Sequence, residues 1–155
     1  DELLEALRGS IALCRTTAQE ISALGLSSNL SEGLRLLALR KNRLFGLLCD
    51  VDVDEDTARR LPVATATHVY RIVQESLRNA ALHGHATQCR LSLRSEGDLV
   101  DLAVSDDGEG FDPTGRHGDG LGLKIIRYRA EQFGGTVEIT SAPGEGTTVR
   151  CRFAL

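Results

Sequence analysis

The sequence predicts an α+β fold of two layers, in which helices pack on one face of a mixed, mostly antiparallel sheet. Several late segments alternate apolar and polar residues, so each strand presents apolar side chains to one side only. Such one-sided strands are typical of an antiparallel sheet with one solvated face. Earlier segments repeat apolar residues at the three- and four-residue spacing of amphipathic helices. The length of 155 residues, with 41% apolar and 26% charged residues, fits one soluble domain.

The N-terminal part of the chain is expected to form two helices. Residues 1–24 show an amphipathic helical pattern that Gly25 ends. A second helix is expected to run to about Phe45, where Gly46 provides a stop signal. Serines in front of it are candidate N-caps: Ser27, Ser28 and Ser31.

The rest of the chain is expected to supply the sheet and one long helix. A short strand is expected at about residues 47–53, a polar loop at 54–62, and a long helix from Thr65 to His83. Alternating segments then predict four strands: residues 89–95, 99–106, 136–141 and 147–155. A helix is expected between the second and third of these segments, carrying Leu123, Ile126, Ala130 and Phe133.

Composition excludes several classes of protein. A net charge of −4 and the absence of Trp argue against nucleic-acid binding. The sequence contains no apolar run long enough to span a bilayer, so a soluble, cytoplasmic chain is expected. The cysteines are widely spaced and lack metal-ligand spacing, so they are interpreted as reduced core residues, with a disulfide as the weaker alternative: Cys14, Cys49, Cys89 and Cys151.

A polar stripe runs along the predicted long helix. Glu75, Asn79 and His83 are spaced four residues apart, opposite the apolar arc that holds Val73 and Leu77. Such a stripe is commonly a solvated helix face. Glu and Asn oxygens also suit Mg²⁺, which keeps several waters and binds substrate phosphates. Both interpretations stay open at this point.

The stretch "DDGEGF" places a carboxylate on the apolar side of a strand. Counting by twos from Val100 reaches Asp106, whose side chain therefore shares the face of the buried residues. A buried carboxylate needs a partner, and the exocyclic amine of adenine would satisfy it. Gly108 and Gly110 would let the chain turn beneath a flat base. The alternative is a hairpin turn at Asp107-Gly108.

The following stretch "GDGLGLK" puts glycines at the start of a predicted helix. Gly118, Gly120 and Gly122 would expose backbone N–H groups, which bind phosphate oxygens at a helix N-terminus. The glycines do not follow a strand directly, which argues against a dinucleotide-binding Rossmann fold. Arg116 and His117 in the preceding loop are candidates for phosphate contacts, or are simply solvated.

Four segments in order resemble the N, G1, G2 and C-terminal glycine-threonine boxes of the Bergerat-fold ATPases: "QESLRNAALHG", "DDGEGF", "GDGLGL" and "APGEGTT". That superfamily includes histidine kinases, gyrase-type topoisomerases, heat-shock chaperones and mismatch-repair ATPases. Within it, "VYRIVQESLRNAALHG" and "GLGLKIIRYRAEQFGG" look most similar to sensor histidine kinases of the nitrate-sensor and desaturase-sensor type. The resemblance covers residues 63–155 strongly and continues more loosely upstream.

The resemblance implies a domain order and a set of site residues. Residues 1–24 would be the end of a dimerisation helix, 25–46 a linker and first helix, and 47–155 the ATP-binding catalytic domain. Asn79 would bind Mg²⁺ and phosphate, with Glu75 beside it as a metal, water or proton-handling group. The implied nucleotide-binding residues are Asn79, His83, Asp106, Gly108, Gly110, Gly118, Gly120, Leu121, Gly122, Leu123 and Thr147. Leu82 departs from the family's usual Lys; the charge of Arg78, Arg116 or His117 is a candidate replacement.

The implied function is the ATP-binding part of a histidine protein kinase. It would present the γ-phosphate of Mg-ATP to an acceptor His, for relay to an Asp on a response regulator, within a homodimer. His68, His83, His85 and His117 lack the acidic neighbour expected of an acceptor. The acceptor is therefore expected outside this chain, which would bind ATP without labelling itself. Alternatives are a degenerate regulatory module, a hydrolysing Bergerat-type ATPase and an anti-sigma Ser/Thr kinase.

Overall fold

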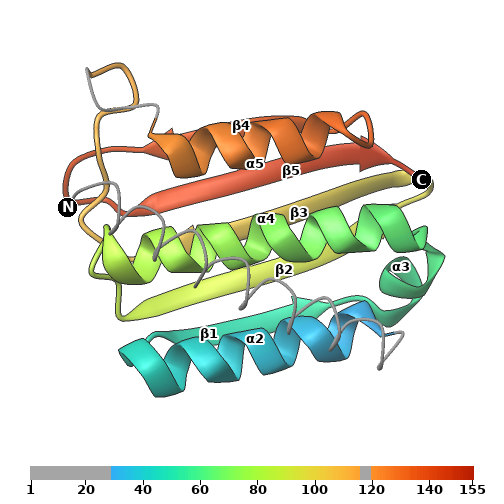
Figure 1. The fold of residues 1–155 in the computed structure, drawn as a ribbon, viewed down its shortest axis with the longest axis horizontal. Helices are drawn as coiled ribbons and strands as arrows, with labels where there is room; N and C mark the ends of the chain where they lie inside the picture. Colours follow the sequence, from blue (N-terminus) through green and yellow to red (C-terminus); the bar gives the residue numbers. More distant parts are fainter. Residues whose placement is uncertain (1–28, 116–119) are drawn as a thin grey trace, which may run out of the picture.

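The computed structural model describes residues 29–115 and 120–155, which form a five-stranded sheet covered by helices (Figure 1). The helices are α2 (Leu30–Phe45), α3 (Glu55–Arg60), α4 (Val63–Leu82) and α5 (Leu121–Glu131). The strands are β1 (Leu48–Val53), β2 (Gln88–Glu96), β3 (Leu99–Asp106), β4 (Thr136–Ser141) and β5 (Thr147–Ala154). The helix expected over residues 1–24 lies outside the described residues.

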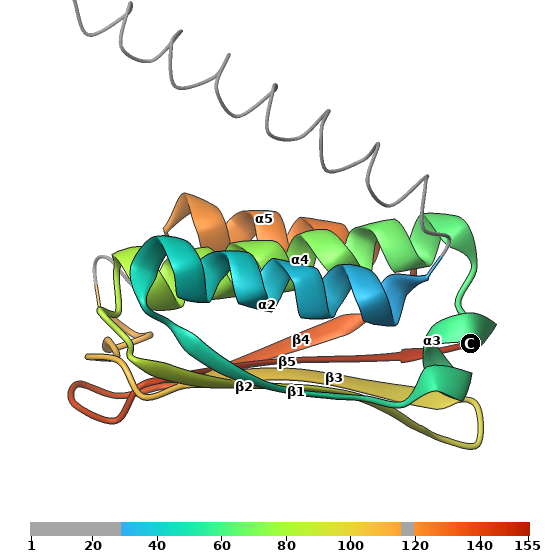
Figure 2. The same cartoon turned by 90° about the horizontal axis from the view of Figure 1, so that it is seen from below.

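The sheet has the order β1-β2-β3-β5-β4. β1 pairs with β2 in parallel, whereas the other neighbouring pairs are antiparallel. Figure 2 shows α2, α4 and α5 in one layer on the same face of the sheet, with the opposite face uncovered. The predicted two-layer fold with a mixed sheet is therefore confirmed.

The core lies between the sheet and the middle helix, α4. Val73 and Leu77 of α4 are fully buried, as are Leu91 of β2 and Leu102 of β3. These are the inward positions that the period of each element predicts. Burying a side chain of this size contributes about 1.5 to 3 kcal/mol. The core thereby fixes the rotation of α4 about its axis, and with it the direction of the polar stripe.

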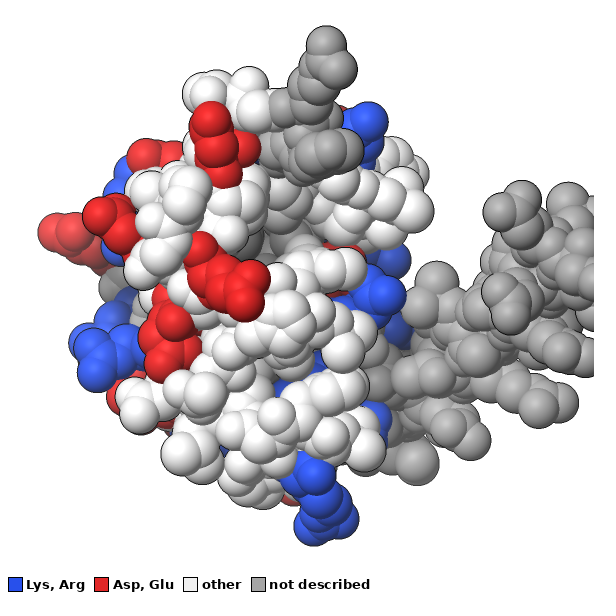
Figure 3. All heavy atoms as spheres, turned by 90° about the vertical axis from the view of Figure 1, so that its left-hand side faces the viewer, with Lys and Arg blue, Asp and Glu red and all other residues white. Residues whose placement is uncertain are grey.

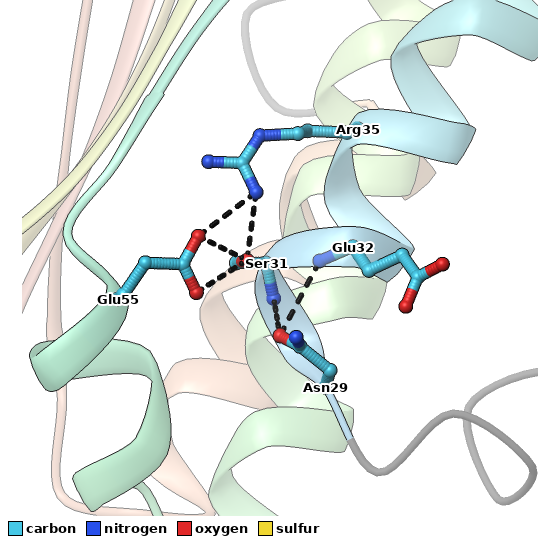
Figure 4. A network of polar contacts seen from close by, with 5 residues as sticks. All are labelled: Asn29, Ser31, Glu32, Arg35 and Glu55. Atoms are coloured by element: carbon cyan, nitrogen blue, oxygen red, sulfur yellow. Dashed lines mark hydrogen bonds and ion pairs between the residues drawn. The ribbon is translucent and has the colours of Figure 1, made fainter.

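The N-terminus of α2 differs from the predicted serine cap. The Asn29 side chain accepts from the Ser31 N–H at 3.1 Å, which makes Asn29 the N-cap. The Ser31 hydroxyl instead donates to Glu55 of α3, and Arg35 donates to the same carboxylate at 2.9 Å (Figure 4). Hydrogen bonds from Ser31 and Arg35 lower the pKa of Glu55. Gly46 ends α2 in the left-handed region at φ 69°, as expected.

The predicted polar loop over residues 54–62 is wrong, because most of it forms α3. Asp54 caps this helix by accepting from the Thr57 N–H at 2.9 Å. Acidic residues occupy its first turn and basic residues its last, which favours the helix dipole. The helix buries only Thr57 and Ala58, so it has no apolar periodicity to reveal it. α4 also begins two residues earlier than expected, directly after Pro62.

Every helix in the described ranges is too short or too polar to cross a membrane.

Candidate functional site

The predicted site residues that the structure describes gather at one end of the molecule. At this end α4 and β3 finish, α5 begins, and the loop between β4 and β5 turns back (Figure 1). Figure 3 shows this end with Asp and Glu side chains grouped in the left half of the view and Lys and Arg side chains spread over its left, right and lower parts. Segments far apart in the sequence therefore meet here.

The polar stripe of α4 meets the start of α5 at Gly122. A Cβ atom at Gly122 would lie 3.0 and 3.1 Å from the two terminal atoms of the Asn79 amide, and it would overlap Glu75 Oε1. The α5 backbone therefore approaches two predicted ligand residues at a distance that only glycine permits. Arg78 Nη1 lies 3.4 Å from Glu75 Oε1, so the carboxylate has a cationic neighbour.

His83 shares the stripe but differs in its surroundings. It is the C-cap of α4, its N–H bonds to the Asn79 carbonyl at 3.0 Å, and its side chain is exposed. Leu82, which stands where the resemblance expects Lys, is 41% exposed. Glu75 and Asn79 are thus brought together, whereas His83 stands at the rim.

Asp106 ends β3 with its side chain on the inward side, as the alternation predicts. The carboxylate is half-buried and accepts from the Gly108 N–H at 2.8 Å. Burial raises the pKa of Asp106 above its usual range, although hydrogen bonds from the Gly108 and Thr147 backbones oppose this rise. A half-buried carboxylate of this kind suits a ligand that donates N–H groups.

The glycine loop after β3 docks against the end of α4. The Glu109 N–H donates to the Gly84 carbonyl at 2.7 Å. Gly108 packs on the same carbonyl, because a Cβ there would lie 2.6 Å from it. β3 is flanked by β2 and β5, and the chain enters α5 before the next strand. The alternative of a tight hairpin at Asp107-Gly108 is therefore wrong.

The same loop also docks against the turn between β4 and β5. Gly110 has φ 65°, and a Cβ there would overlap the Ala142 carbonyl oxygen. The Gly144 N–H donates to the Glu109 carbonyl at 2.6 Å. Gly146 has φ 72°, and a Cβ there would likewise overlap the Asp106 carbonyl oxygen. The two glycine segments hold each other in place around Asp106.

Thr147 lies directly opposite Asp106 as the first residue of β5. Its hydroxyl is 2.8 Å from the Ser141 hydroxyl across the β4–β5 pair. Ser141 in turn accepts from the Phe111 N–H at 2.9 Å. Sequence reasoning found Thr147 through the resemblance but did not assign Ser141, which links the loop after β3 to this strand pair.

Asp107 is a second residue that sequence reasoning left without a role. Its carboxylate accepts from the N–H groups of Thr87 and Gln88, each at 2.9 Å, and from the Thr87 hydroxyl. These hydrogen bonds lower its pKa. Asp107 therefore anchors the start of β2, while its neighbour Asp106 faces the site.

The start of α5 offers backbone groups to the same end. Gly120 is the N-cap, and no side chain forms a capping hydrogen bond there. Leu121 is 76% exposed, whereas Leu123 is buried in the core. An N-terminus of this kind favours an anion. The predicted residues Arg116, His117 and Gly118 lie outside the described residues.

The arrangement therefore offers three kinds of chemistry at one end of the sheet. Asp106 is a half-buried acceptor for N–H donors, α5 supplies backbone donors for anions, and Glu75 with Asn79 supplies oxygens suited to a hard cation. The Gly122 backbone connects the last two, because it approaches both oxygen-bearing side chains. A ligand with a base at one side and phosphates with Mg²⁺ at the other fits this set.

Comparison with protein families agrees with this geometry. Residues 64–155 match the family described as histidine kinase-, DNA gyrase B-, and HSP90-like ATPase. The sensor protein VraS of Staphylococcus haemolyticus is 28% identical over 142 residues, as is VraS of Staphylococcus aureus. These alignments cover 91% of this chain and 40% of each relative, so the chain spans less than half of their length.

Two solved structures show the same fold. The histidine kinase domain of the blue-light activated histidine kinase from Erythrobacter litoralis EL346 aligns with a TM-score of 0.69 at 24% identity. That alignment covers 82% of this chain and 61% of the other. The mycobacterial sensor histidine kinase MprB aligns with a TM-score of 0.60 at 20% identity, covering 81% and 94% of the two chains.

Proposed function

This chain belongs to the histidine kinase-, DNA gyrase B- and HSP90-like ATPase family, and we propose that it is the ATP-binding catalytic domain of a sensor histidine kinase. The observation that carries the proposal is the approach of the Gly122 backbone to Glu75 and Asn79 at the end where Asp106 lies. The similarity to VraS supports the sensor kinase assignment within the family. The motifs quoted above favour the nitrate-sensor and desaturase-sensor type.

The base end of the nucleotide is assigned to Asp106. Its carboxylate would accept a hydrogen bond from the adenine amine in addition to the one that it accepts from the Gly108 N–H. Gly108 and Gly110 hold the loop beside it against the Gly84 and Ala142 carbonyls. Thr147, on the neighbouring strand β5, would support the pocket. Its hydroxyl is held in place by the Ser141 hydroxyl of β4.

The phosphate end is assigned to the polar stripe of α4 and the start of α5, which face each other at Gly122. The N–H groups at the start of α5 would bind phosphate oxygens without a cationic side chain. Asn79 and Glu75 would hold Mg²⁺, which supplies charge neutralisation on the phosphates when bound. Among the described residues no cluster of three or more His, Cys, Asp or Glu forms a metal site. A site of two protein ligands completed by phosphate and water agrees with that finding.

Phosphoryl transfer requires mainly positioning and charge stabilisation from the protein. This domain would orient the γ-phosphate toward an acceptor His supplied by dimerisation helices outside the described residues. The phosphate would then pass to an Asp of a response regulator. The homodimer and this relay are parts of the proposal that follow from the family assignment.

The test is calorimetric titration of the chain with a non-hydrolysable ATP analogue, with and without Mg²⁺. We expect saturable binding, about a tenfold or larger loss of affinity in Asp106→Asn, and loss of the Mg²⁺ dependence in Asn79→Ala. Asp101→Asn is the matched control, because it removes a carboxylate from the uncovered face of β3, where Arg150 pairs with it. Gln132→Ala, at the far end of α5, is the control for the amide.

A second candidate is a degenerate regulatory module without useful nucleotide affinity. The exposed Leu82 favours it, because an apolar side chain stands at the end of α4 where a cation would attract phosphates. Absence of binding in the intact chain, at nucleotide concentrations up to the millimolar range, would select this candidate. The hydrolysing ATPase would instead release phosphate from ATP without any acceptor, and the anti-sigma kinase would phosphorylate Ser or Thr.

A further inference from the structure

Two cysteines lie side by side on neighbouring strands. Cys49 of β1 and Cys89 of β2 are register partners in a parallel pair. Neighbouring strands are about 4.8 Å apart, which falls within the Cα separation of about 4.4 to 6.8 Å found in disulfides. Both residues pack on the core side of the sheet. The register therefore places the two Cα atoms at a separation that allows a disulfide.

The two thiols differ in accessibility. Cys89 is only 6% exposed, whereas Cys49 is half-buried. Both line a groove of about 600 Å³ between α2 and the first two strands, whose other walls include Arg35, Leu39 and Asn42. A small reagent can therefore reach Cys49 from this groove, with Cys89 beside it on the neighbouring strand.

The chemistry of the pair is correspondingly unequal. A hydrogen bond from the Cys89 thiol lowers the pKa of Cys49. The hydrogen bond to Cys49, burial and the carboxylates of Asp106 and Asp107 raise the pKa of Cys89. The thiolate is the nucleophilic form of cysteine. Cys49 is therefore the attacking thiol and Cys89 the resolving one.

We propose that Cys49 and Cys89 form a redox-active dithiol that closes into a cross-strand disulfide when a small-molecule disulfide such as oxidised glutathione enters the groove. The Cys49 thiolate attacks one glutathione sulfur, forms a mixed disulfide and releases the first glutathione thiolate. Cys89 loses its proton to that thiolate and attacks the Cys49 sulfur. The second glutathione leaves as a thiolate and takes up the proton that Cys49 released. Two protein thiols are oxidised, and one glutathione disulfide is reduced to two thiols.

The edge position of β1 in the described sheet favours closure. β1 has β2 as its single neighbour in the described sheet, so it can shift toward β2 without breaking another strand pair. The resulting bridge would lie beside Asp106, because Cys89 and Asp106 are register partners across β2 and β3. The proposal concerns the thiols alone and does not depend on nucleotide binding.

The test is oxidation of the chain with oxidised glutathione, followed by tryptic digestion and mass spectrometry without reduction. A Cys14→Ser background removes a competing thiol that lies outside the described residues. We expect a linked pair of peptides spanning residues 44–59 and 79–90, with a loss of two hydrogen atoms. Cys151→Ser is the matched control and leaves the link unchanged, because Cys151 is fully buried on β5.

Cys49→Ser and Cys89→Ser each abolish the linked peptides. A second measurement on the unsubstituted chain covers the case in which a variant does not fold: pulsed alkylation with iodoacetamide. We expect Cys49 to react at least about ten times faster than Cys151, because burial raises the pKa of Cys151 to about 11. Oxidised chains that keep both thiols free, or equal alkylation of Cys49 and Cys151, would overturn the proposal.

Discussion

Asp106 and Thr147 face each other as the last register pair between β3 and β5, at the end of the sheet where α4 stops. The pairing turns a half-buried carboxylate toward the site and fixes the hydroxyl opposite it through Ser141. The Gly108 N–H donates to the Asp106 carboxylate, and Gly146 packs against the Asp106 carbonyl oxygen. The β3–β5 pair and the two glycine segments therefore hold the Asp106 carboxylate at a half-buried position, where burial disfavours its charged form.

This arrangement predicts that Asp106→Asn stabilises the fold while it weakens nucleotide binding. Because the pKa of Asp106 is raised by burial, the native state holds more protons than the unfolded state between the two pKa values. The unsubstituted chain therefore loses stability as pH rises from the unfolded pKa through the folded pKa, and then stays level. Asp106→Asn lacks this loss, and its amide oxygen can still accept from Gly108.

Urea unfolding at a series of pH values measures this difference. The gain in unfolding free energy of Asp106→Asn should grow as pH rises from the unfolded pKa of Asp, be full above the folded pKa of Asp106, and disappear below the unfolded pKa. The control Asp101→Asn should show no gain, because its carboxylate pairs with Arg150. A gain of equal size at acidic and neutral pH would contradict the explanation by buried charge.

Gly122→Ala is expected to weaken binding of Mg²⁺ and nucleotide with little effect on stability. The added Cβ would displace the Glu75 carboxylate and crowd the Asn79 amide, while alanine is a favourable residue inside a helix. We expect about a tenfold or greater loss of affinity in calorimetry. Gly97→Ala is the control, since nothing lies within 4 Å of a Cβ there and Gly97 lies in the turn between β2 and β3, outside the candidate site; equal losses in both variants would refute this role of Gly122.

Gly110→Ala is expected to destabilise the fold by about 2 to 4 kcal/mol. The variant combines a left-handed backbone at φ 65° with overlap between the new Cβ and the Ala142 carbonyl. Gly97→Ala separates these two causes, because Gly97 has φ 60° but open space around its Cβ. It should cost only about 1 kcal/mol in urea unfolding. Equal costs would show that the loop adjusts to the extra methyl group.

Some site residues could be predicted because they follow from the period of one element. Strand alternation placed Asp106 on the inward side, and helical spacing placed Glu75 and Asn79 together. Both predictions needed only local geometry. The distance between Asp106 and the pair Glu75 and Asn79 could not be predicted in this way, because it depends on how the helices pack. The same holds for the approach of Gly122 to α4, which depends on how α5 packs.

Other features were missed because they depend on partners distant in sequence or on short elements. Asp107 stands beside Asp106 with the same side chain, yet its partners Thr87 and Gln88 belong to another strand. Asn29 is the N-cap in place of Ser31, since the Ser31 hydroxyl bonds to Glu55 of α3 instead, while Ser27 and Ser28 lie outside the described residues. A six-residue helix such as α3 has too few turns for a period to be recognised.

The adjacent carboxylates Asp106 and Asp107 should respond to pH in opposite directions. Hydrogen bonds from Gln88 and Thr87 lower the pKa of Asp107. Its contribution to stability is therefore present above the unfolded pKa of Asp and is lost as pH falls through the lower, folded pKa. Asp107→Ala should lower the unfolding free energy at pH 7, with the difference from the unsubstituted chain shrinking in acid.

The Asp106→Asn and Asp107→Ala variants measured together separate the two roles. Their differences from the unsubstituted chain at neutral pH should have opposite signs, because one carboxylate is held against burial and the other is stabilised by three hydrogen bonds. Asp106→Asn should lower nucleotide affinity even when the variant is fully folded. Any loss of affinity in Asp107→Ala should instead be explained by the fraction of that variant that is unfolded. If Asp107→Ala lost affinity while fully folded, Asp107 would belong to the binding site rather than to its support.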